Sequence, residues 1–348
     1  MNQLKIAVLF GGCSPEYEVS LKSAYSVITH MSEYEPILIG ISRSGAWFHF
    51  SGAPQKILDD TWLNPDDCTQ AIISPDRKTK GVLVFEQSRV RILKLDAAMP
   101  ILHGKYGEDG TVQGLLELAG IPVVGCGTLA SALCMDKDRA HKIAAAAGVR
   151  VPRSFTANAA TNRDRLYRQA ERLGFPLFVK PVKAGSSFGI TKVWSKDGLT
   201  AAMQCALSYD DAVIVEETIA GFEVGCAVLG DGDNLLVGEL DEIELADGFF
   251  DYAEKYTLET SSIHVPARIS KQKADEIKTA AQTIYRALGC TGFARVDQFL
   301  MPCGEIVFNE VNTIPGFTAH SRYPNMLKAI GMTFEEVISI LIEQAVRI

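Results

Sequence analysis

The chain of 348 residues carries a net charge of −8, with 47% hydrophobic and 22% charged residues. This length and composition predict two or three domains with sizeable apolar cores. Lysine and arginine form no basic run, which excludes nucleic acid as a main partner, because phosphate binding needs a basic surface. No apolar stretch approaches a membrane span or a signal-peptide core, and the eight cysteines contain no CxxC pair. We therefore expect a cytoplasmic protein with reduced cysteines and no membrane association.

The N-terminal part alternates between strand and helix patterns. Residues 4–10 form a continuous apolar run closed by Gly11 and Gly12, which is typical of a buried parallel strand. Further strands are predicted at 37–41 and 97–102, and helices at 16–31 and 113–118. This βαβ order predicts an open α/β domain over residues 1–128.

Two further domains are predicted at 129–213 and 214–348. The first has helices at 136–147 and 162–173 and strands near Val151 and at 177–180. In the second, apolar runs separated by Gly-rich turns indicate an antiparallel sheet, with strands at 212–215, 223–229 and 234–240. Residues 244–262 have no clear period, and loops of this length inside compact domains often act as lids.

The strongest local signal is a hairpin near the C-terminal end. Apolar runs at 293–299 and 306–312 flank the turn 302–305. If residue 302 pairs with residue 305, the register of the whole hairpin follows outward from the turn. Within each strand, side chains two apart share a face. One face then carries Arg295, Asp297, Glu310 and Asn312.

Asp297 and Glu310 face each other directly in this register, and paired like charges weaken a sheet. A cation between them removes the repulsion. Asp, Glu and Asn oxygens are ligands that Mg²⁺ takes while it shares phosphate oxygens. Asp297, Glu310 and Asn312 are therefore candidate metal ligands. The alternative is a solvated polar face with one Arg–Asp ion pair.

A second signal is the segment 180–189, which follows an apolar strand and combines lysine with two glycines and two hydroxyls. Such a loop can bind phosphates through backbone N–H groups, although a plain Gly/Ser turn also fits. It is not a Walker A motif. Residues 125–130 fit GxGxxG/A, but no acidic residue follows about 20 positions later, so we discount a dinucleotide site.

Five ordered motifs resemble those of the ATP-grasp superfamily, specifically the D-alanine–D-alanine ligase family and its vancomycin-resistance relatives. They lie at 11–20, 103–110, 135–137, 180–189 and 309–318. The resemblance covers the whole chain. It implies a mixed α/β and α+β protein, an ATP-grasp fold of three consecutive α/β domains, with nucleotide held between the central and C-terminal domains.

The resemblance also implies roles for individual residues. ATP binding falls to Lys137, Lys180, Ser187, Glu216, Glu217, Ile219 and Glu223, with the lysines on phosphates, 216–219 on adenine and Glu223 on ribose. Asp297, Glu310 and Asn312 would hold two Mg²⁺ ions, with Mn²⁺ as an alternative ion. A homodimer that binds small-molecule substrates is implied as well.

Catalytic roles are implied for Glu16, Ser186, Tyr256, Arg295 and Gly316. Glu16 would hold the ammonium group of the first D-alanine, and Ser186 and Tyr256 would link to it and close the 244–262 lid. Arg295 and the backbone N–H of Gly316 would stabilise a tetrahedral oxyanion. Glu16 also fits an acid that stabilises a helix N-terminus.

The implied substrate-binding residues are His103, Phe250, Lys255, Ser321 and Arg322. His103 would lie near the first substrate, although a packed histidine is the alternative. In the implied reaction, the γ-phosphoryl of ATP passes to the carboxylate of D-alanine, and the amine of a second amino acid attacks the acylphosphate. Mg²⁺ and the two lysines would offset the charge of the moving phosphoryl group.

Two positions concern the second substrate. Family members usually have Tyr and Leu where this chain has Phe250 and Arg322. Arginine here resembles the resistance ligases that make D-Ala–D-lactate or D-Ala–D-serine. The depsipeptide-forming relatives replace the Lys-Tyr pair of the lid, and Lys255–Tyr256 is intact. We therefore expect D-serine, with Arg322 donating to its hydroxyl directly or through water.

Three alternatives remain for the function. They are a housekeeping D-Ala–D-Ala ligase, a D-Ala–D-lactate ligase, and a non-catalytic nucleotide-binding regulator of the same fold. Arg322 itself also fits a surface arginine paired with an acid.

Overall fold

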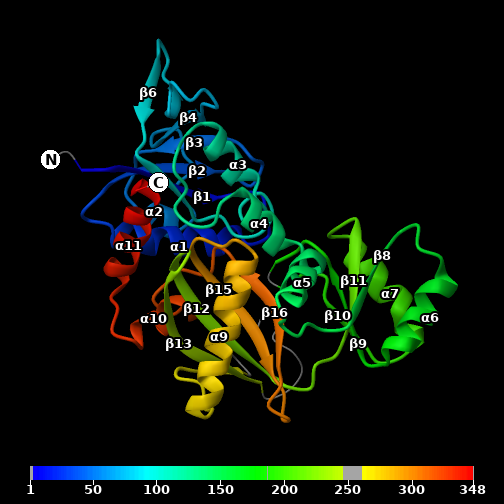
Figure 1. Ribbon diagram of the computed structural model, residues 1–348. Helices are drawn as coiled ribbons and strands as arrows, with labels where there is room; N and C mark the ends of the chain where they lie inside the picture. Colours follow the sequence, from blue (N-terminus) through cyan, green and yellow to red (C-terminus); the bar gives the residue numbers. More distant parts are fainter. Residues whose placement is uncertain (1–2, 186, 246–260, 348) are drawn as a thin grey trace.

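The computed structural model describes residues 3–185, 187–245 and 261–347. They form three β-sheets with helices packed around them (Figure 1). A seven-stranded sheet forms the N-terminal unit, a four-stranded sheet the central unit and a five-stranded sheet the C-terminal unit. Three mixed α/β units in chain order confirm the predicted fold class.

The N-terminal sheet has the order β6-β5-β4-β3-β2-β1-β7. Its elements are β1 Lys5–Gly11, α1 Tyr17–Thr29, β2 Glu35–Ile41, β3 Trp47–Phe50, α2 Gln55–Leu58, β4 Cys68–Ile73, β5 Gly81–Phe85, β6 Val90–Lys94, β7 Ala97–Pro100 and α3 Thr111–Leu118. β1 pairs in parallel with β2 and β7, as the sequence predicts. β2 to β6 continue as an antiparallel meander, and β3 to β6 were not predicted.

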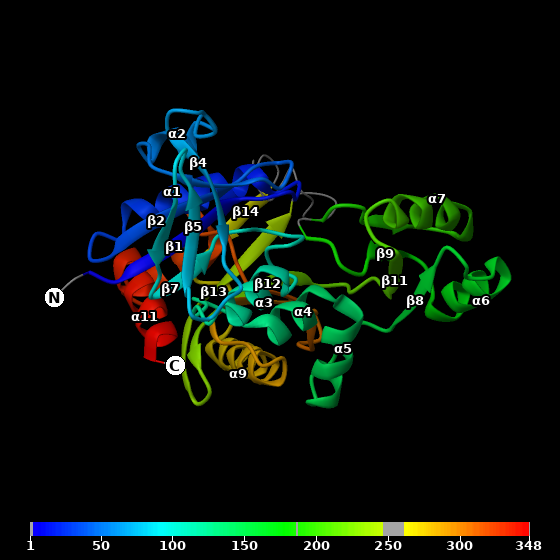
Figure 2. The same cartoon turned by 90° about the horizontal axis from the view of Figure 1, so that it is seen from above.

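The central unit projects to one side of the molecule, as Figure 2 shows from above. Its elements are α4 Thr128–Met135, α5 Lys137–Ala146, β8 Ser154–Asn158, α6 Arg163–Leu173, β9 Leu177–Pro181, β10 Thr191–Val193, α7 Lys196–Leu207 and β11 Ala212–Glu217. The strand predicted near Val151 is wrong, because Pro152 cannot donate to a ladder and β8 begins only at Ser154.

β11 lies between β9 and β8 in the central sheet. The prediction that residues 212–215 belong to the C-terminal antiparallel sheet is therefore wrong. An apolar run shows that a strand is buried, but it does not show which neighbours bury it. We propose that the division between the central and C-terminal units falls after Glu217 rather than at residue 213.

The C-terminal sheet has the order β14-β13-β12-β15-β16. Its elements are β12 Phe222–Asp231, β13 Asn234–Leu245, β14 Ser261–His264, α9 Lys271–Ala287, β15 Gly292–Leu300, β16 Ile306–Asn312, α10 Arg322–Lys328 and α11 Phe334–Arg347. None of the helices in the described ranges is long and apolar enough to cross a membrane.

The register of the β15–β16 hairpin is as predicted at the polar positions, where Asp297 faces Glu310 and Arg295 faces Asn312. Near the turn the predicted pairing of residues 302 and 305 is wrong. Leu300 pairs with Ile306, and a bulge leaves one extra residue in β16 between the two registers.

One apolar core joins the N- and C-terminal units. Ile6 and Val8 of β1 belong to the same buried cluster as Phe293 of β15 and Ile338 and Leu341 of α11. The last helix, α11, packs against both β7 and β15 (Figure 1). This shared core fixes the two units relative to each other.

Candidate active site

A cavity of about 640 Å³ lies between the central and C-terminal units. Its walls include all seven residues predicted to bind ATP, namely Lys137, Lys180, Ser187, Glu216, Glu217, Ile219 and Glu223. Glu310, a predicted metal ligand, lines the same cavity. Segments from β9, β11, β12 and β16 are thus brought together around one space.

The two lysines are held by acidic and carbonyl groups at the cavity wall. Lys180 Nζ lies 2.6 Å from the carboxylate of Glu216. Lys137 donates to the carbonyl oxygen of Ala184 at 2.7 Å and lies 3.8 Å from Glu310. Both ammonium groups therefore face the space in which phosphates would be bound.

Glu216 is buried, with 2% exposure. Burial acts to raise the pKa of this carboxyl, but the charges of Lys180 and His141 outweigh it and hold the pKa below its usual value. Within the described part of the chain, Glu216 Oε1 has no hydrogen-bond partner. A buried acceptor in the cavity wall fits a donor such as the amino group of adenine.

Asp297 and Glu310 are each close to a cationic side chain. Asp297 accepts from Nε and Nη2 of Arg295 at 2.8 and 2.7 Å and from Nδ2 of Asn312 at 2.9 Å. The ion pair of the alternative interpretation is therefore present, but Asp297 is buried rather than solvated.

The described residues contain no group of three or more His, Cys, Asp or Glu that could hold a metal ion. The predicted set has two carboxylates and one amide. Asp297 and Glu310 are a direct cross-strand pair, and Asn312 lies on the next pair of the same face. Their oxygen chemistry fits a divalent cation that also shares phosphate oxygens.

Arg322, the first residue of α10, lies on the same face of the sheet. Its guanidinium donates to both carboxylate oxygens of Asp241 at 2.6 and 2.8 Å and to Glu223 at 2.8 Å. It also lies 3.4 Å from Asp297. Arg322 is paired with acids, as the alternative interpretation proposed, but the surface position is wrong, because the residue is buried.

Two neighbours make room for this arginine and neutralise it. Gly225 has no side chain, and a Cβ there would lie 2.4 Å from Arg322 Nη2. Asp241, which is fully buried, was not predicted from the sequence. Asp241 is one of four acids in β13, so its residue type did not single it out, and its partner lies 81 positions away.

Glu16 precedes α1 at the point where two loops meet. A Cβ at Gly104 would lie 2.3 Å from its Oε2 atom, and a Cβ at Gly185 would lie 2.8 Å from the same atom. The 103–110 loop and the 180–189 loop therefore both contact this carboxylate. Glycine at both positions leaves space around a group predicted to hold the ammonium of the first substrate.

His103 contacts protein groups through both ring nitrogens. Nδ1 lies 2.9 Å from the carbonyl oxygen of Ile314, and Nε2 lies 3.3 Å from Oγ of Ser23. Burial lowers the pKa of His103 to about 4. In this structure the residue packs as a neutral histidine, which is the alternative that the sequence left open.

Glu108 was not predicted from the sequence as a site residue. Its carboxylate accepts the N–H groups of Gly104 and Ile314, both at 2.9 Å. Burial and the charge of Glu16 raise the pKa of Glu108 to about 8. The signal that could have found it is its place inside the 103–110 motif.

Ser321 and Gly316 lie side by side in the segment that follows β16. Ser321 Oγ accepts the N–H of Thr318 at 3.0 Å, and a Cβ at Gly316 would lie 3.0 Å from the same oxygen. Four predicted site residues, Ser186, Phe250, Lys255 and Tyr256, lie outside the described residues. So does most of the predicted 244–262 lid, whose ends belong to β13 and β14.

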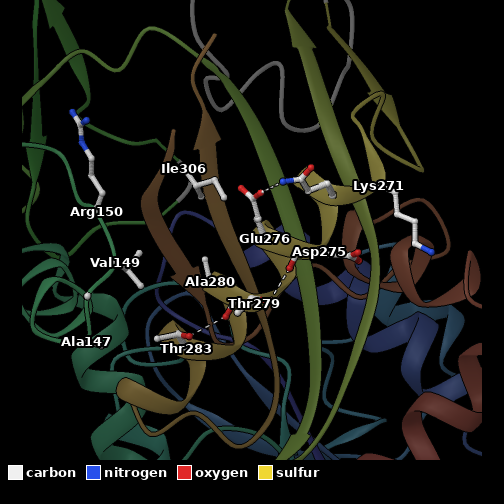
Figure 3. Close-up of a pocket in the computed structure, with 12 residues that line it drawn as sticks. Ala147, Val149, Arg150, Lys271, Asp275, Glu276, Thr279, Ala280, Thr283 and Ile306 are labelled. Carbon is white, nitrogen blue, oxygen red and sulfur yellow. Dashed lines mark hydrogen bonds between the residues drawn. The ribbon is translucent and has the colours of Figure 1, made fainter. Parts of the chain in front are cut away.

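A second groove of about 900 Å³ lies between α9 and the segment 147–150, which follows α5 (Figure 3). Its lining includes Arg150, Asp275 and Glu276 and none of the predicted site residues. The seven residues predicted to bind ATP and Glu310 line the inner cavity instead.

Comparisons with known proteins agree with this geometry. Family models described as "D-ala D-ala ligase N-terminus" and "D-ala D-ala ligase C-terminus" match residues 5–126 and 144–343. The vancomycin/teicoplanin A-type resistance protein VanA of Enterococcus faecium is 44% identical, with 100% of both chains covered. A D-alanine–D-alanine ligase of Caldicellulosiruptor bescii is 40% identical, with 99% of this chain and 96% of the relative covered.

A solved structure, the VanG D-Ala:D-Ser ligase from Enterococcus faecalis, is also similar. It is 56% identical and superposes with a TM-score of 0.91 over 98% of this chain and 99% of the other.

Proposed function

Because the chain belongs to the D-alanine–D-alanine ligase family of ATP-dependent, divalent-metal-using ligases, we propose that it joins D-alanine to D-serine through a D-alanyl phosphate. Such a dipeptide would enter cell-wall precursors and confer glycopeptide resistance. The observation that carries the proposal is the position of Arg322, buried on the same sheet face as Arg295 and Asp297. The similar VanG structure, that of a D-Ala:D-Ser ligase, supports the same choice.

The nucleotide would occupy the cavity between the central and C-terminal units. Lys137 and Lys180 would bind its phosphates, and Ser187 would contact it from the 180–189 loop. The adenine would lie against Glu216, Glu217 and Ile219, and Glu223 would bind the ribose. Bound ATP supplies the phosphoryl group that turns a carboxylate oxygen into a leaving group. The lysines offset the negative charge that approaches the substrate carboxylate.

Asp297, Glu310 and Asn312 would hold two Mg²⁺ ions, with Mn²⁺ as an alternative. The support is the direct pairing of Asp297 and Glu310, with Asn312 on the next pair. When bound, such ions would supply positive charge that offsets the charge of the phosphates. Arg295 and Lys137 would then share the neutralisation of these carboxylates with the metal.

The first D-alanine would lie between Glu16 and Gly316. Glu16 would bind its ammonium group, and Arg295 and the N–H of Gly316 would face the oxygen on which charge develops when the amine attacks. Donors fixed before the reaction need no reorganisation as the charge forms. Arg322 would contact the hydroxyl of D-serine.

A housekeeping D-alanine–D-alanine ligase is the second candidate. Three N–H groups of Arg322 already bind Asp241 and Glu223, which leaves fewer donors for a substrate hydroxyl. In that case Arg322 would shape the pocket and would not form a hydrogen bond with the second substrate.

The protein is also proposed to be a cytoplasmic homodimer. Exposed Ile72, Phe85, Val90 and Ile92 lie on the outer strands β4 to β6, where a second copy could cover them. Light scattering after size exclusion would give the mass, and Ile92→Lys should reduce it if this surface forms the dimer. A single-chain mass for the wild-type protein would contradict the proposal.

The test of function is ADP release with D-alanine alone compared with D-alanine plus D-serine. We expect D-serine to raise turnover and D-Ala–D-Ser to be the main dipeptide under direct competition at fixed ATP. If D-Ala–D-Ala dominates, the second candidate is correct.

A further inference from the structure

Three side chains of the N-terminal unit hold the segment 314–317, which follows β16. His103 and Glu108 bind the two backbone groups of Ile314, its carbonyl oxygen and its N–H, each at 2.9 Å. Ser23 Oγ accepts the N–H of Phe317 at 3.3 Å. The backbone is therefore held on both sides of Gly316.

The histidine contacts define one hydrogen-bond direction. A carbonyl oxygen only accepts, so Nδ1 of His103 carries the hydrogen that faces Ile314. Nε2 is then an acceptor for the hydroxyl of Ser23. Ser23 Oγ in turn accepts from the N–H of Phe317. This chain runs from Phe317 through Ser23 and His103 to Ile314, and all of its members are buried.

Glu108 ties the same segment to the loop that contacts Glu16. One oxygen of Glu108 accepts from Ile314 and the other from Gly104. Gly104 also lies against the Glu16 carboxylate. The single buried carboxyl group of Glu108 thus links the backbone beside Gly316 to the group proposed to hold the substrate ammonium.

Helix α1 sets the spacing between these two regions. Glu16 precedes the first residue of α1, and Ser23 lies two turns further along on the same face. Two turns of helix span about 10 Å along the axis. One rigid element therefore carries both the proposed ammonium-binding acid and an anchor of the 314–317 segment.

We propose that Ser23, His103 and Glu108 are positioning residues that hold the N–H of Gly316 where the oxyanion forms. The proposal rests on the proposed ligase function. Ser23, His103 and Glu108 act through the backbone of Ile314 and Phe317, without touching the reacting atoms. This role replaces the substrate contact that the sequence implied for His103.

The two steps of the reaction should depend differently on this anchor. In the first, D-alanine takes a phosphoryl group from ATP, and the substrate carbonyl gains no full charge. In the second, the amine nitrogen bonds to the carbonyl carbon while the π electrons move onto oxygen. Collapse of that oxyanion expels phosphate, and the amine proton passes to phosphate or water. A misplaced Gly316 should therefore slow the second step selectively.

The test compares Ser23→Ala with Ser131→Ala, a matched change of a fully buried helix serine whose Oγ bonds to Cys126. Positional isotope exchange in labelled ATP with D-alanine alone reports the first step, and dipeptide formation reports both. For Ser23→Ala we expect wild-type exchange and a loss of dipeptide turnover of about 10²-fold. Ser131→Ala should match the wild type in both assays.

Equal losses in both assays, or no loss in either, would overturn the proposal. If the wild-type protein shows no exchange that depends on D-alanine, the ligase function itself is wrong, which is a distinguishable result.

A second pair of variants covers the case in which Ser23→Ala does not fold. His103→Asn keeps a donor near the Nδ1 position, whereas His103→Gln keeps a polar group near Nε2 only. Calorimetry with a phosphinate analogue of the tetrahedral intermediate should show weaker binding for both, and more so for Gln, with unchanged binding of an ATP analogue. Unchanged phosphinate affinity in both variants would reject the positioning role.

Discussion

At the scale of single residues, the first prediction concerns Glu310, whose carboxylate faces that of Asp297 on the β15–β16 hairpin. Glu310→Gln removes a carboxylate charge opposite Asp297 without changing the shape of the side chain. We expect dipeptide turnover at ordinary Mg²⁺ to fall by about 10²–10³-fold, as when one transition-state contact is lost. The melting temperature without metal should stay near wild type, because relief of the Asp297 repulsion offsets the lost contact with Lys137.

The matched control is Glu305→Gln, the same substitution at an exposed residue that pairs with Arg150 near the hairpin turn. It should retain wild-type turnover. Near wild-type turnover of Glu310→Gln itself would show that Glu310 is not a metal ligand.

Arg322 neutralises a fully buried acid, which leads to the second prediction. Arg322→Leu leaves Asp241, which is fully buried, without its cationic partner. Breaking a buried pair in this way costs about 3–5 kcal/mol. We expect urea unfolding to show a loss of this size, with partial recovery in the double variant Arg322→Leu/Asp241→Asn.

The double variant also serves the question of selectivity, because it should be stable enough to assay. We expect its ratio of D-Ala–D-Ser to D-Ala–D-Ala to fall. The fall should correspond to a loss of about 1–3 kcal/mol in the preference for D-serine, as for one lost hydrogen bond to a substrate hydroxyl. An unchanged ratio would assign Arg322 to structure alone.

The third prediction concerns His103 and acid. Burial lowers the pKa of His103 from 6.5 to about 4, with a smaller effect from the charge of Arg295. The unfolded chain therefore binds a proton at higher pH than the folded one. The stability that neutral His103 contributes is fully present above pH 6.5 and is lost as the pH falls through about 4.

The shift from 6.5 to about 4 corresponds to at most about 3 kcal/mol of unfolding free energy. In His103→Asn this part of the pH dependence should disappear from urea titrations between those two pH values. His320→Asn, at an exposed histidine, should keep the wild-type slope. Identical slopes in His103→Asn and wild type would show that His103 does not titrate in this range.

At the scale of elements, a glycine in β12 lets a helix residue reach the sheet. A Cβ at Gly225 would lie 2.4 Å from both Arg322 Nη2 and Asp241 Oδ1. Gly225→Ala should therefore displace the guanidinium, destabilise the fold by about 1–3 kcal/mol and lower dipeptide turnover. Gly198→Ala, in helix α7, should leave turnover unchanged and favour the helix by about 0.5–1 kcal/mol. Unchanged stability in Gly225→Ala would contradict this account.

The elements also show what the sequence could predict. Asp297 faces Glu310 as predicted although the predicted pairing at the turn is wrong, because the extra residue of the β16 bulge offsets the shift at the turn. The bulge could not be predicted, because its extra residue, Asn309, is not of a type that marks an unpaired position in a strand. Strands β3 to β6 escaped prediction because they are short, with four to six residues each, so that each offers few positions for a pattern.

Long-range pairings set a second limit. The sequence pointed to Arg322 but not to Asp241, because the two meet only when α10 packs on β13. The implied contact of His103 with substrate likewise overlooked Ile314, which lies 211 positions further along the chain. Residues within one motif were grouped correctly, whereas partners from different units required the structure.

At the scale of the whole molecule, the nucleotide cavity lies where two units meet, and this gives the fifth prediction. A ligand that binds only the folded chain stabilises it by RT ln(1 + [L]/Kd), about 2.7 kcal/mol at 100 times Kd. A non-hydrolysable ATP analogue with Mg²⁺ should raise the unfolding free energy by this amount. Lys137→Ala should lose much of the increase, whereas Thr279→Ala, in the groove of Figure 3, should keep it. If the unfolding free energy of the wild type does not increase, the cavity does not bind the nucleotide.

The core that joins β1 to α11 has a consequence for how the protein is made. A ribosome releases β1 before α11, yet Ile6 and Val8 share their packing with Ile338 and Leu341. During synthesis the apolar side of the first unit stays uncovered until the last helix emerges, so the nascent chain presents a binding surface for chaperones throughout elongation. Stop codons that remove only α11 should therefore leave Ile6 and Val8 of β1 without part of their packing.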